Sequence, residues 1–332
     1  MNITNKNKSP NFMPVMAVLG AVFLWGSAFA AMKYLVDGMH PMAVMWLRTG
    51  IATIVLTPFA ARLTRPVKKG KDRKALALMA LLMPCLYFLF ESYALTFTSA
   101  TQAGLVSASL PLMVAAGAGI FFKEKTTVAG WLGLALSMAG VVALTLTGKP
   151  TENASNPLLG NSLELIAMIA AAGYMLLVKR LSANYGPWTL TAVQNCVGCL
   201  FFMPGLYYLF RDGLGPDPVT LLLVAGYLGA FVTLGAFGLY NVGMSKLPAG
   251  KASVFINLVP ATSAFFGWVI LGETLTFPQI VASAVIFGGV GLAQHGDRKA
   301  SREKAHGEEN AKDSVAGDVE LTEVPVSVPV QK

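Results

Sequence analysis

Apolar residues are gathered into ten long stretches, and polar or charged residues lie mostly in the short segments between them. Each stretch comes close to the about 20 mostly apolar residues that a helix needs to cross a bilayer. The short connections favour antiparallel pairs of neighbouring helices. The pattern predicts an all-α membrane protein with ten transmembrane helices, over residues 14–36, 41–61, 74–97, 101–122, 127–147, 158–180, 187–210, 218–244, 250–271 and 277–294.

The last five stretches repeat the first five. Identical residues recur at an offset of 149 positions, which pairs Ala103, Pro111, Glu124, Thr127, Ala135, Gly140 and Val141 with Ala252, Pro260, Glu273, Thr276, Ala284, Gly289 and Val290. Nearer the start of each half the offset is 146, since Lys33 and Pro41 match Lys179 and Pro187. The chain is therefore expected to be a duplication of a five-helix unit.

The duplication divides the chain into two repeats, 14–147 and 158–294, joined by a polar linker over 148–157. Short polar segments flank them, at 1–13 and at 295–332, and the second of these has the composition of a disordered tail. Because five is an odd number of crossings, the second repeat is predicted to be inverted relative to the first. Inverted repeats are typical of secondary transporters, which bind substrate where the repeats meet.

Positive charge defines the predicted orientation. Lys33, Lys149 and Arg211 fall in segments predicted to lie outside and Arg48 within a span, whereas every other Lys and Arg falls in segments on the opposite side. Since basic residues collect on the cytoplasmic side, both termini are predicted to be cytoplasmic and the linker external. The net charge of +8 is explained by this topology, so no nucleic-acid partner is expected.

Few residues in the sequence are suited to catalysis. The three histidines, His40, His295 and His306, lie in an outer turn, at the end of the last stretch and in the tail, so neither a metal site nor a histidine-based triad is predicted. Phosphate-binding glycine loops are absent. No cofactor is expected, and a carrier is favoured over an enzyme, with an intramembrane enzyme or a channel as the alternatives from other classes.

Short motifs in both halves resemble those of the drug/metabolite transporter superfamily, within it the ten-helix group built of two EamA-type repeats. They are Trp25-Gly26-Ser27-Ala28-Phe29, Arg48, Ala94-Leu95, Thr98-Ser99-Ala100, Pro111, Glu124, Pro260 and Gly272-Glu273. The resemblance implies a multi-pass protein of the bacterial inner membrane that exports small, amino-acid-like metabolites by alternating access. Proton coupling, a monomer or homodimer, and partners limited to the substrate and the lipid bilayer fit this interpretation. The runner-up is an exchanger or importer of the same superfamily.

Arg48 and Glu91 are the main candidates for a polar site. Arg48 lies about 10 Å inside the second span and Glu91 about 9 Å inside the third, counted from the predicted outer ends at the rise of an α-helix. Charged groups at such depths usually face the interior of the bundle and act on substrates or ions. Arg48 is predicted to bind substrate or to clamp helices together. Glu91 is predicted to balance Arg48, to bind substrate or to couple transport to protons.

Six further candidates are less specific. Glu164, inside the sixth span, is a second coupling candidate, or a residue that snorkels to the interface. Trp25 and Gly26 are predicted to line a substrate cavity, with helix packing as the alternative. The amide of Asn257 is suited to bind substrate or to join helices. Pro111 and Pro260 interrupt equivalent helices and are candidate hinges.

Overall fold

The computed structural model describes residues 12–59, 72–123, 127–182, 184–236, 238–240 and 255–296. Helices make up nearly all of this part of the chain, and no strand occurs in it beyond one isolated bridge between Thr151 and Ala154. The all-α prediction is therefore confirmed. The predicted tail, 295–332, lies almost wholly outside the described residues, as do the predicted segment 1–13 up to Asn11 and Glu124.

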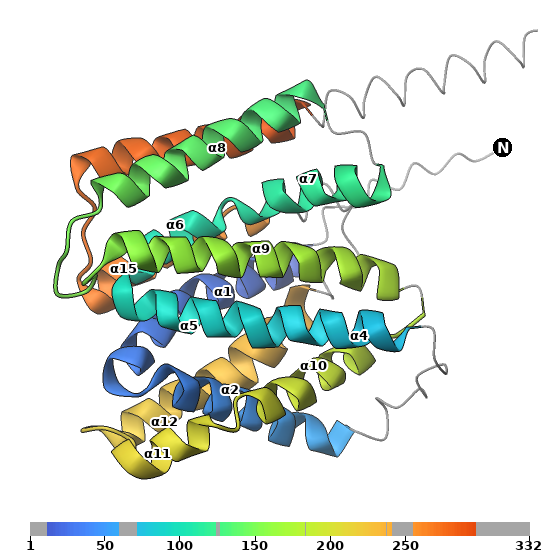
Figure 1. The fold of residues 1–332 in the computed structure, drawn as a ribbon, viewed down its shortest axis with the longest axis vertical. Helices are drawn as coiled ribbons and strands as arrows, with labels where there is room; N and C mark the ends of the chain where they lie inside the picture. Colours follow the sequence, from blue (N-terminus) through green and yellow to red (C-terminus); the bar gives the residue numbers. More distant parts are fainter. Residues whose placement is uncertain are drawn as a thin grey trace, which may run out of the picture.

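The helices follow the predicted spans closely (Figure 1). They are α1 (Phe12–Gly38), α2 (Pro41–Leu56), α4 (Arg73–Ala80), α5 (Tyr87–Phe97), α6 (Ala100–Ser107), α7 (Leu110–Phe122), α8 (Val128–Thr147), α9 (Pro157–Leu181), α10 (Pro187–Phe201), α11 (Gly205–Asp212), α12 (Pro218–Gly226), α15 (Val259–Leu271) and the helix Phe277–Gly296. The short helix η1 (Thr57–Phe59) extends α2, and two π-helical segments, η2 (Leu81–Leu86) and η3 (Tyr227–Ala236), continue α4 and α12.

Seven helices among the described residues are long and apolar enough to cross a membrane. An eighth is obtained if the pair Thr189–Phe201 and Gly205–Asp212, bent by 53°, is one broken span. The apolar helices Pro41–Leu56 and Val259–Leu271 are shorter than a full span, although they lie where the second and ninth spans are predicted. The structure thus supports a multi-pass membrane protein, and the count of ten spans stays a prediction.

The two repeats have matching helix boundaries. At the offset of 149, α7 corresponds residue for residue to α15, and α8 corresponds to the helix Phe277–Gly296. Both α7 and α15 end in a left-handed backbone conformation, at Lys123 with φ 56° and at Gly272 with φ 66°. At the offset of 146, η2 and η3 begin at equivalent positions. The sequence duplication therefore extends to the breaks and ends of the helices.

Small residues bring α8 and the helix Phe277–Gly296 into close contact. A Cβ atom on Gly133 would lie 2.5 Å from the carbonyl oxygen of Gly289, and one on Gly140 would lie 3.0 Å from that of Ala282. Gly289 is the repeat equivalent of Gly140, and Ala282 is the equivalent of Gly133. This reciprocal pairing requires the two helices to run in opposite directions, as two inverted copies do.

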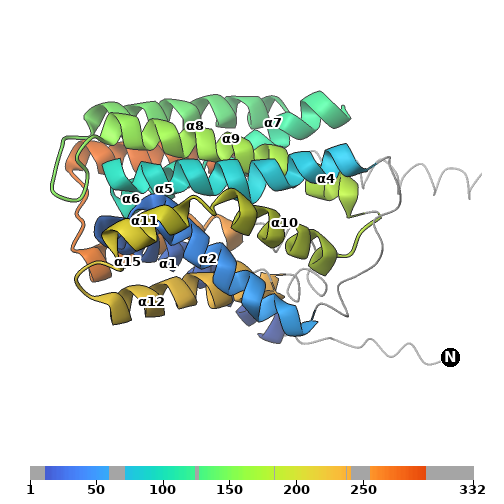
Figure 2. The same cartoon turned by 60° about the horizontal axis from the view of Figure 1, so that its bottom comes forward.

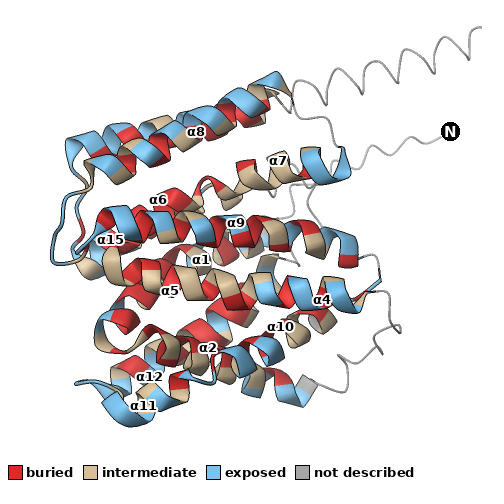
Figure 3. Ribbon diagram, in the orientation of Figure 1, coloured by how far each residue is buried: buried red, intermediate tan, exposed pale blue. Residues whose placement is uncertain are grey.

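The other helices form the body of the molecule, with α8 along one side and α12 along the opposite side (Figures 1 and 2). Its largest apolar core joins α1, α2, α5 and η3. Buried residues concentrate on the central helices (Figure 3). Large apolar side chains are exposed on the outer faces, among them Phe121, Val128, Phe210, Trp268 and Phe277. Such a surface is suited to lipid rather than to water.

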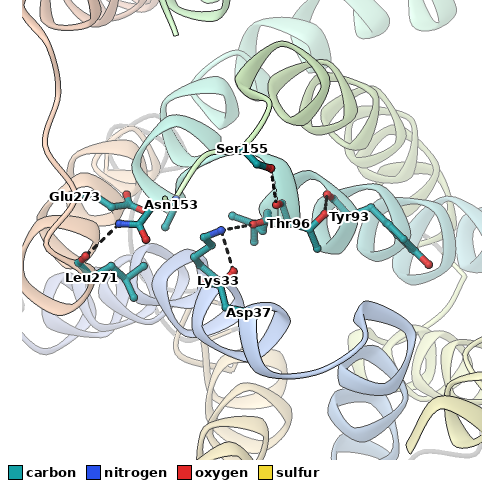
Figure 4. A network of polar contacts seen from close by, with 10 residues as sticks. Lys33, Asp37, Tyr93, Thr96, Asn153, Ser155, Leu271 and Glu273 are labelled. Atoms are coloured by element: carbon teal, nitrogen blue, oxygen red, sulfur yellow. Dashed lines mark hydrogen bonds and ion pairs between the residues drawn. The ribbon is translucent and has the colours of Figure 1, made fainter. Parts of the chain in front are cut away.

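One end of the bundle, the linker end, holds residues 148–156 and the turns that follow α1, α5 and α15. Lys33 is 2% exposed there; its Nζ donates to the carbonyl oxygen of Leu95 at 2.9 Å and pairs with Asp37 at 3.0 Å (Figure 4). The sequence assigns Lys33 to an outer segment, and the structure places it at the linker end but buried within α1. The carboxylate of Asp37, one helical turn away, offsets the cost of burying the charge of Lys33.

The linker contributes further bonds at this end. Asn153 Nδ2 donates to the carbonyl oxygen of Leu271 at 3.4 Å, and Ser155 Oγ donates to that of Thr96 at 3.4 Å (Figure 4). The Glu273 carboxylate accepts the backbone N–H groups of Ala100 and Thr101, each at 2.8 Å. A carboxylate is well placed at a helix N-terminus, because the first N–H groups have no partner within the helix. Glu273 of the second repeat thereby holds α6 of the first.

Candidate functional site

A cavity of about 380 Å³ lies between the two repeats. Its walls come from both of them, and the lining residues reach Ser182 after the end of α9 and Leu190 in the first turns of α10. These residues lie at the end of the bundle opposite the linker, which we call the cavity end. The network around Lys33 and Glu273 contributes no lining residue. The described lining therefore extends toward the cavity end and not toward the linker end.

The walls are mainly aromatic and apolar. Aromatic and methionine side chains are supplied by Trp25, Phe29, Met83, Tyr87, Phe88, Met168, Tyr174, Met175 and Tyr240. Trp25 and Tyr240 contact each other, with ring centroids 5.3 Å apart. Polar groups are few and include Arg48, Glu91, Gln194 and Asn257. A mostly apolar cavity with a few placed polar groups is the usual form of a small-molecule site.

Arg48 and Glu91 come together in the wall of this cavity. Arg48 Nη1 lies 3.7 Å from Glu91 Oε2, and each residue is 6% exposed. Around the pair, Arg48 Nε donates to Thr233 Oγ1 at 3.2 Å, the guanidinium lies 4.1 Å from the centroid of the Phe88 ring, and the Tyr87 hydroxyl donates to Glu91 Oε1. Arg48, on α2, thus contacts two other helical segments, α5 and η3, so the clamp predicted from its depth has a geometric basis, as has substrate contact.

The ion pair leaves two atoms without hydrogen bonds. Neither Arg48 Nη1 nor Glu91 Oε2 has a hydrogen-bond partner among the described residues. Their separation of 3.7 Å is longer than the usual 2.7–2.9 Å of a charge-assisted hydrogen bond. A buried guanidinium N–H and a buried carboxylate oxygen are costly to leave unbonded. The site therefore holds one donor and one acceptor, of opposite charge, that are available for a ligand.

The other predicted residues divide into two groups. Trp25, Asn257, Pro111 and Pro260 all line the cavity. Pro111 stands in the first turn of α7, after a break at residues 108–109, and Pro260 stands in the first turn of α15. Both prolines therefore mark helix interruptions at the cavity wall. Helix starts tolerate proline because its missing N–H would have no partner there.

Gly26 is the exception. It does not line the cavity, and a Cβ on it would lie 2.0 Å from Thr262 Oγ1 of α15. Gly104 is in the same kind of contact, with its Cβ position 1.7 Å from Ser263 Oγ. Gly26 therefore lies where α1 packs closely on α15, which fits the alternative of helix packing.

Glu164 lies on α9 and is wholly buried. Neither of its carboxyl oxygens has a hydrogen-bond partner among the described residues, and the residue does not line the cavity. The prediction that it snorkels to the interface is wrong, since the residue is completely buried among helices.

Sequence analysis missed some residues of the site. Tyr87, which binds Glu91, is four positions before it on one helix face, a spacing that points to contact. Thr233 lies in η3, and no feature of the sequence around it marks a partner for Arg48. Gln194 was not missed, since its amide lies within a predicted span and is suited to bind substrate or to join helices. It lines the cavity and donates to the carbonyl oxygen of Met83 at 3.2 Å, where the chain departs from helical geometry.

No group of three or more His, Cys, Asp or Glu residues that could hold a metal ion occurs in the described ranges. Fold and site together define a multi-pass helical membrane protein, built from two copies of one unit around a cavity of small-molecule size.

The chain belongs to the EamA-like transporter family, whose model matches it twice, over residues 12–146 and 158–293. It is 26% identical to the uncharacterized transporter YetK of Bacillus subtilis, over 83% of this chain and 84% of the relative. An uncharacterized transporter of Archaeoglobus fulgidus is 30% identical over 81% of this chain and 94% of its own length. These relatives indicate a transporter rather than an enzyme.

Two other similarities extend the comparison. A protein of Streptantibioticus cattleyicolor named "Probable terminal-alkyne amino-acid exporter" is 23% identical, over 84% of this chain and 92% of that protein. A solved crystal structure aligns with a TM-score of 0.55 at 20% identity, covering 87% of this chain and 99% of the other. At this identity the structural match supports the fold alone.

Proposed function

We propose that the protein is a secondary transporter that exports small zwitterionic metabolites across the bacterial inner membrane by alternating access. The substrate carries a carboxylate, an ammonium group and an apolar or aromatic body, as an α-amino acid does. The name of the Streptantibioticus cattleyicolor relative is in keeping with this class.

The observation that carries the proposal is the loose Arg48–Glu91 pair in the cavity wall. A substrate carboxylate would bond Arg48 Nη1, and a substrate ammonium would bond Glu91 Oε2, the two atoms that lack partners. Because the pair is neutral as a whole, a zwitterion satisfies both atoms without adding net charge to a buried site. The aromatic and methionine side chains around the pair would cover the apolar body.

Orientation supports export as the direction. The cavity end carries Arg73, Lys74, Lys123, Lys179 and Arg180, whereas the linker end carries the exposed Lys149 and Arg211. Basic residues favour the cytoplasmic side, so we place the cavity end and both termini in the cytosol. With this orientation the lining extends toward the cytosol, and substrate would load from there.

The alternative within the superfamily is a carrier of phosphorylated metabolites. Phosphate groups need several inward-facing cations, and Arg48 is the one Lys or Arg among the described residues that lines the cavity. This observation favours a zwitterion over a phosphorylated substrate. A channel would differ in kinetics, since its flux does not saturate as that of a carrier does.

Uptake of labelled L-phenylalanine into liposomes that contain the purified protein tests the proposal. We expect saturable transport that is inhibited by unlabelled phenylalanine and leucine. Phenethylamine, which lacks the carboxylate, and 3-phenylpropionate, which lacks the ammonium, should each inhibit at least about tenfold more weakly, since each forfeits one charge-assisted bond. Equal inhibition by all three ligands, or flux that never saturates, would refute a zwitterion site.

A further inference from the structure

Glu164 is a buried carboxyl group that the proposed substrate site does not use. It is 0% exposed, lies on α9 where this helix packs along α5, and has no hydrogen bond from either oxygen among the described residues. Polar neighbours one turn away bond to each other instead: Thr98 Oγ1 donates to Asn161 Oδ1 at 2.7 Å, and Asn161 Nδ2 donates to Gln102 Oε1 at 3.1 Å. An ionised carboxylate in this position would be unbalanced.

The charged groups around Glu164 all come from one side. On α5, Glu91 and Tyr87 are the groups that interact with it electrostatically, and Tyr93 is directed toward His40 at the linker end. The other helices packed on α9 contribute few titratable groups. Helices α6, α7 and α8 contain none, α4 contributes Arg73 and Lys74 at the cavity end, and η2 contributes the thiol of Cys85.

The charges of this cluster decide its protonation. Arginine side chains stay positively charged in proteins, and Glu91 is the ion-pair partner of Arg48. A second ionised carboxylate would give the cluster a net negative charge in a site of low dielectric, with no donor to solvate it. The cluster is neutral only when one of its two carboxyl groups carries a proton, and Glu164, which lacks both a cation and a donor, is the group that gains most by carrying it.

We propose that Glu164 is the binding site for the proton that drives transport, separate from the substrate cavity. A sodium ion fits less well, because it would need several oxygen ligands and the described residues offer no acidic cluster around this carboxyl group.

Glu91 connects this proton to the cavity. The Tyr87 hydroxyl occupies Glu91 Oε1, which leaves Oε2 free to accept. The proton leaves the Glu164 carboxyl for Glu91 Oε2, so that Glu164 becomes a carboxylate and Glu91 a carboxylic acid, and then passes from Glu91 to water in the cavity. This step rests on the proposed function: the substrate ammonium and the proton that passes from Glu164 compete for Glu91 Oε2, and this competition couples the two flows in opposite directions.

Infrared difference spectra of the purified full-length protein, between acidic and alkaline pH, test the proton site without any substrate. A protonated-carboxyl band that persists at neutral pH is expected in the wild type and should be lost in Glu164→Gln. It should remain in Glu152→Gln, a matched change on the exposed linker. Identical carboxyl bands in wild type and Glu164→Gln at every pH would overturn the proposal.

Liposomes that contain the protein test the coupling, with labelled L-phenylalanine as the probe. A pH gradient of one unit should give the wild type about tenfold accumulation for one proton per substrate. Glu164→Gln should lose this accumulation while exchange of labelled for unlabelled phenylalanine at equal pH continues, and Glu164→Asp should recover part of it. Loss of both modes together with a lowered melting temperature would show a structural role. Accumulation that follows a sodium gradient and not the pH gradient would exclude the proton. Absence of any saturable exchange in the wild type would refute the substrate site and leave the infrared result standing.

Discussion

Replacement of Arg48 separates the two roles that its contacts suggest. Arg48→Ala removes the ion pair with Glu91, the bond to Thr233 Oγ1 and the contact with Phe88. Arg48→Lys keeps the charge and loses the planar fork that reaches Thr233 and the cavity at the same time. Both changes should therefore impair transport, and Arg48→Ala should also impair folding.

The magnitudes follow from the contacts. A hydrogen bond to a charged group contributes about 1.5–3 kcal/mol, so losing the substrate carboxylate contact should raise KM about 10- to 150-fold. Leaving Glu91 buried without its cation should cost about 3–5 kcal/mol of stability. The double variant Arg48→Met with Glu91→Gln removes both charges of the pair, so no unpaired charge remains. Its stability should be close to that of the wild type, but its substrate site should lack both charged groups.

Transport of labelled phenylalanine and a thermal unfolding curve, measured on the same preparations, distinguish these effects. The double variant should melt close to the wild type and fail to transport. Arg211→Ala, at an exposed arginine of the linker end, is the control for loss of a guanidinium and should transport normally. If the double variant transports with an unchanged KM, the pair is a scaffold and does not bind substrate.

Three more predictions address the fold. Gly289→Leu should lower the melting temperature by forcing α8 away, since a Cβ there would lie 2.5 Å from the backbone nitrogen of Ser137. The neighbouring Gly288→Leu faces open space and should be tolerated. Equal effects of the two changes would contradict the reciprocal contact. Glu273→Gln should weaken the bonds to Ala100 and Thr101 at the linker end, and a cysteine placed at the buried Thr98 should then react faster with a thiol reagent than in the parent. In a background without the native cysteines, Glu152→Cys should be labelled from outside intact cells and Arg180→Cys protected, and the reverse pattern would overturn the orientation.

Much of the fold could be predicted because lipid imposes a simple rule on the sequence. Every span needs a long apolar run, so the runs, their ends and their repetition are visible in the residues themselves. The helix breaks were less visible. Pro111 and Pro260 indicated two of them, but the π-helical segments η2 and η3 depend on how neighbouring helices pack, and the bend between α10 and α11 divides a run that reads as continuous.

The charged residues of the site were the easiest to predict. Arg48, Glu91 and Glu164 stand out because ionisable groups are rare within spans, and estimates of depth from helix rise placed the first two at similar levels. Uncharged residues were predicted less completely: Trp25, Asn257, Pro111 and Pro260 line the cavity as expected, but others did not stand out. Thr233 resembles any threonine in an apolar run, and Gly26 resembles a cavity glycine until its distance to Thr262 is known.

The two repeats place equivalent positions at the cavity but supply different side chains there. At the offset of 146, Trp25 corresponds to Ala171 and Arg48 to Gln194, and all four line the cavity. The fold therefore presents equivalent positions from both halves to one central space, as inverted repeats do. The side chains at these positions have diverged: the first repeat supplies the indole and the guanidinium, and the second supplies a methyl group and an amide. Duplication thus predicts which positions face the cavity, whereas the ion pair in the cavity wall belongs to the first repeat. For the proposed zwitterionic substrate, an ion pair confined to one half predicts one bound orientation, with its carboxylate at Arg48 and its ammonium at Glu91.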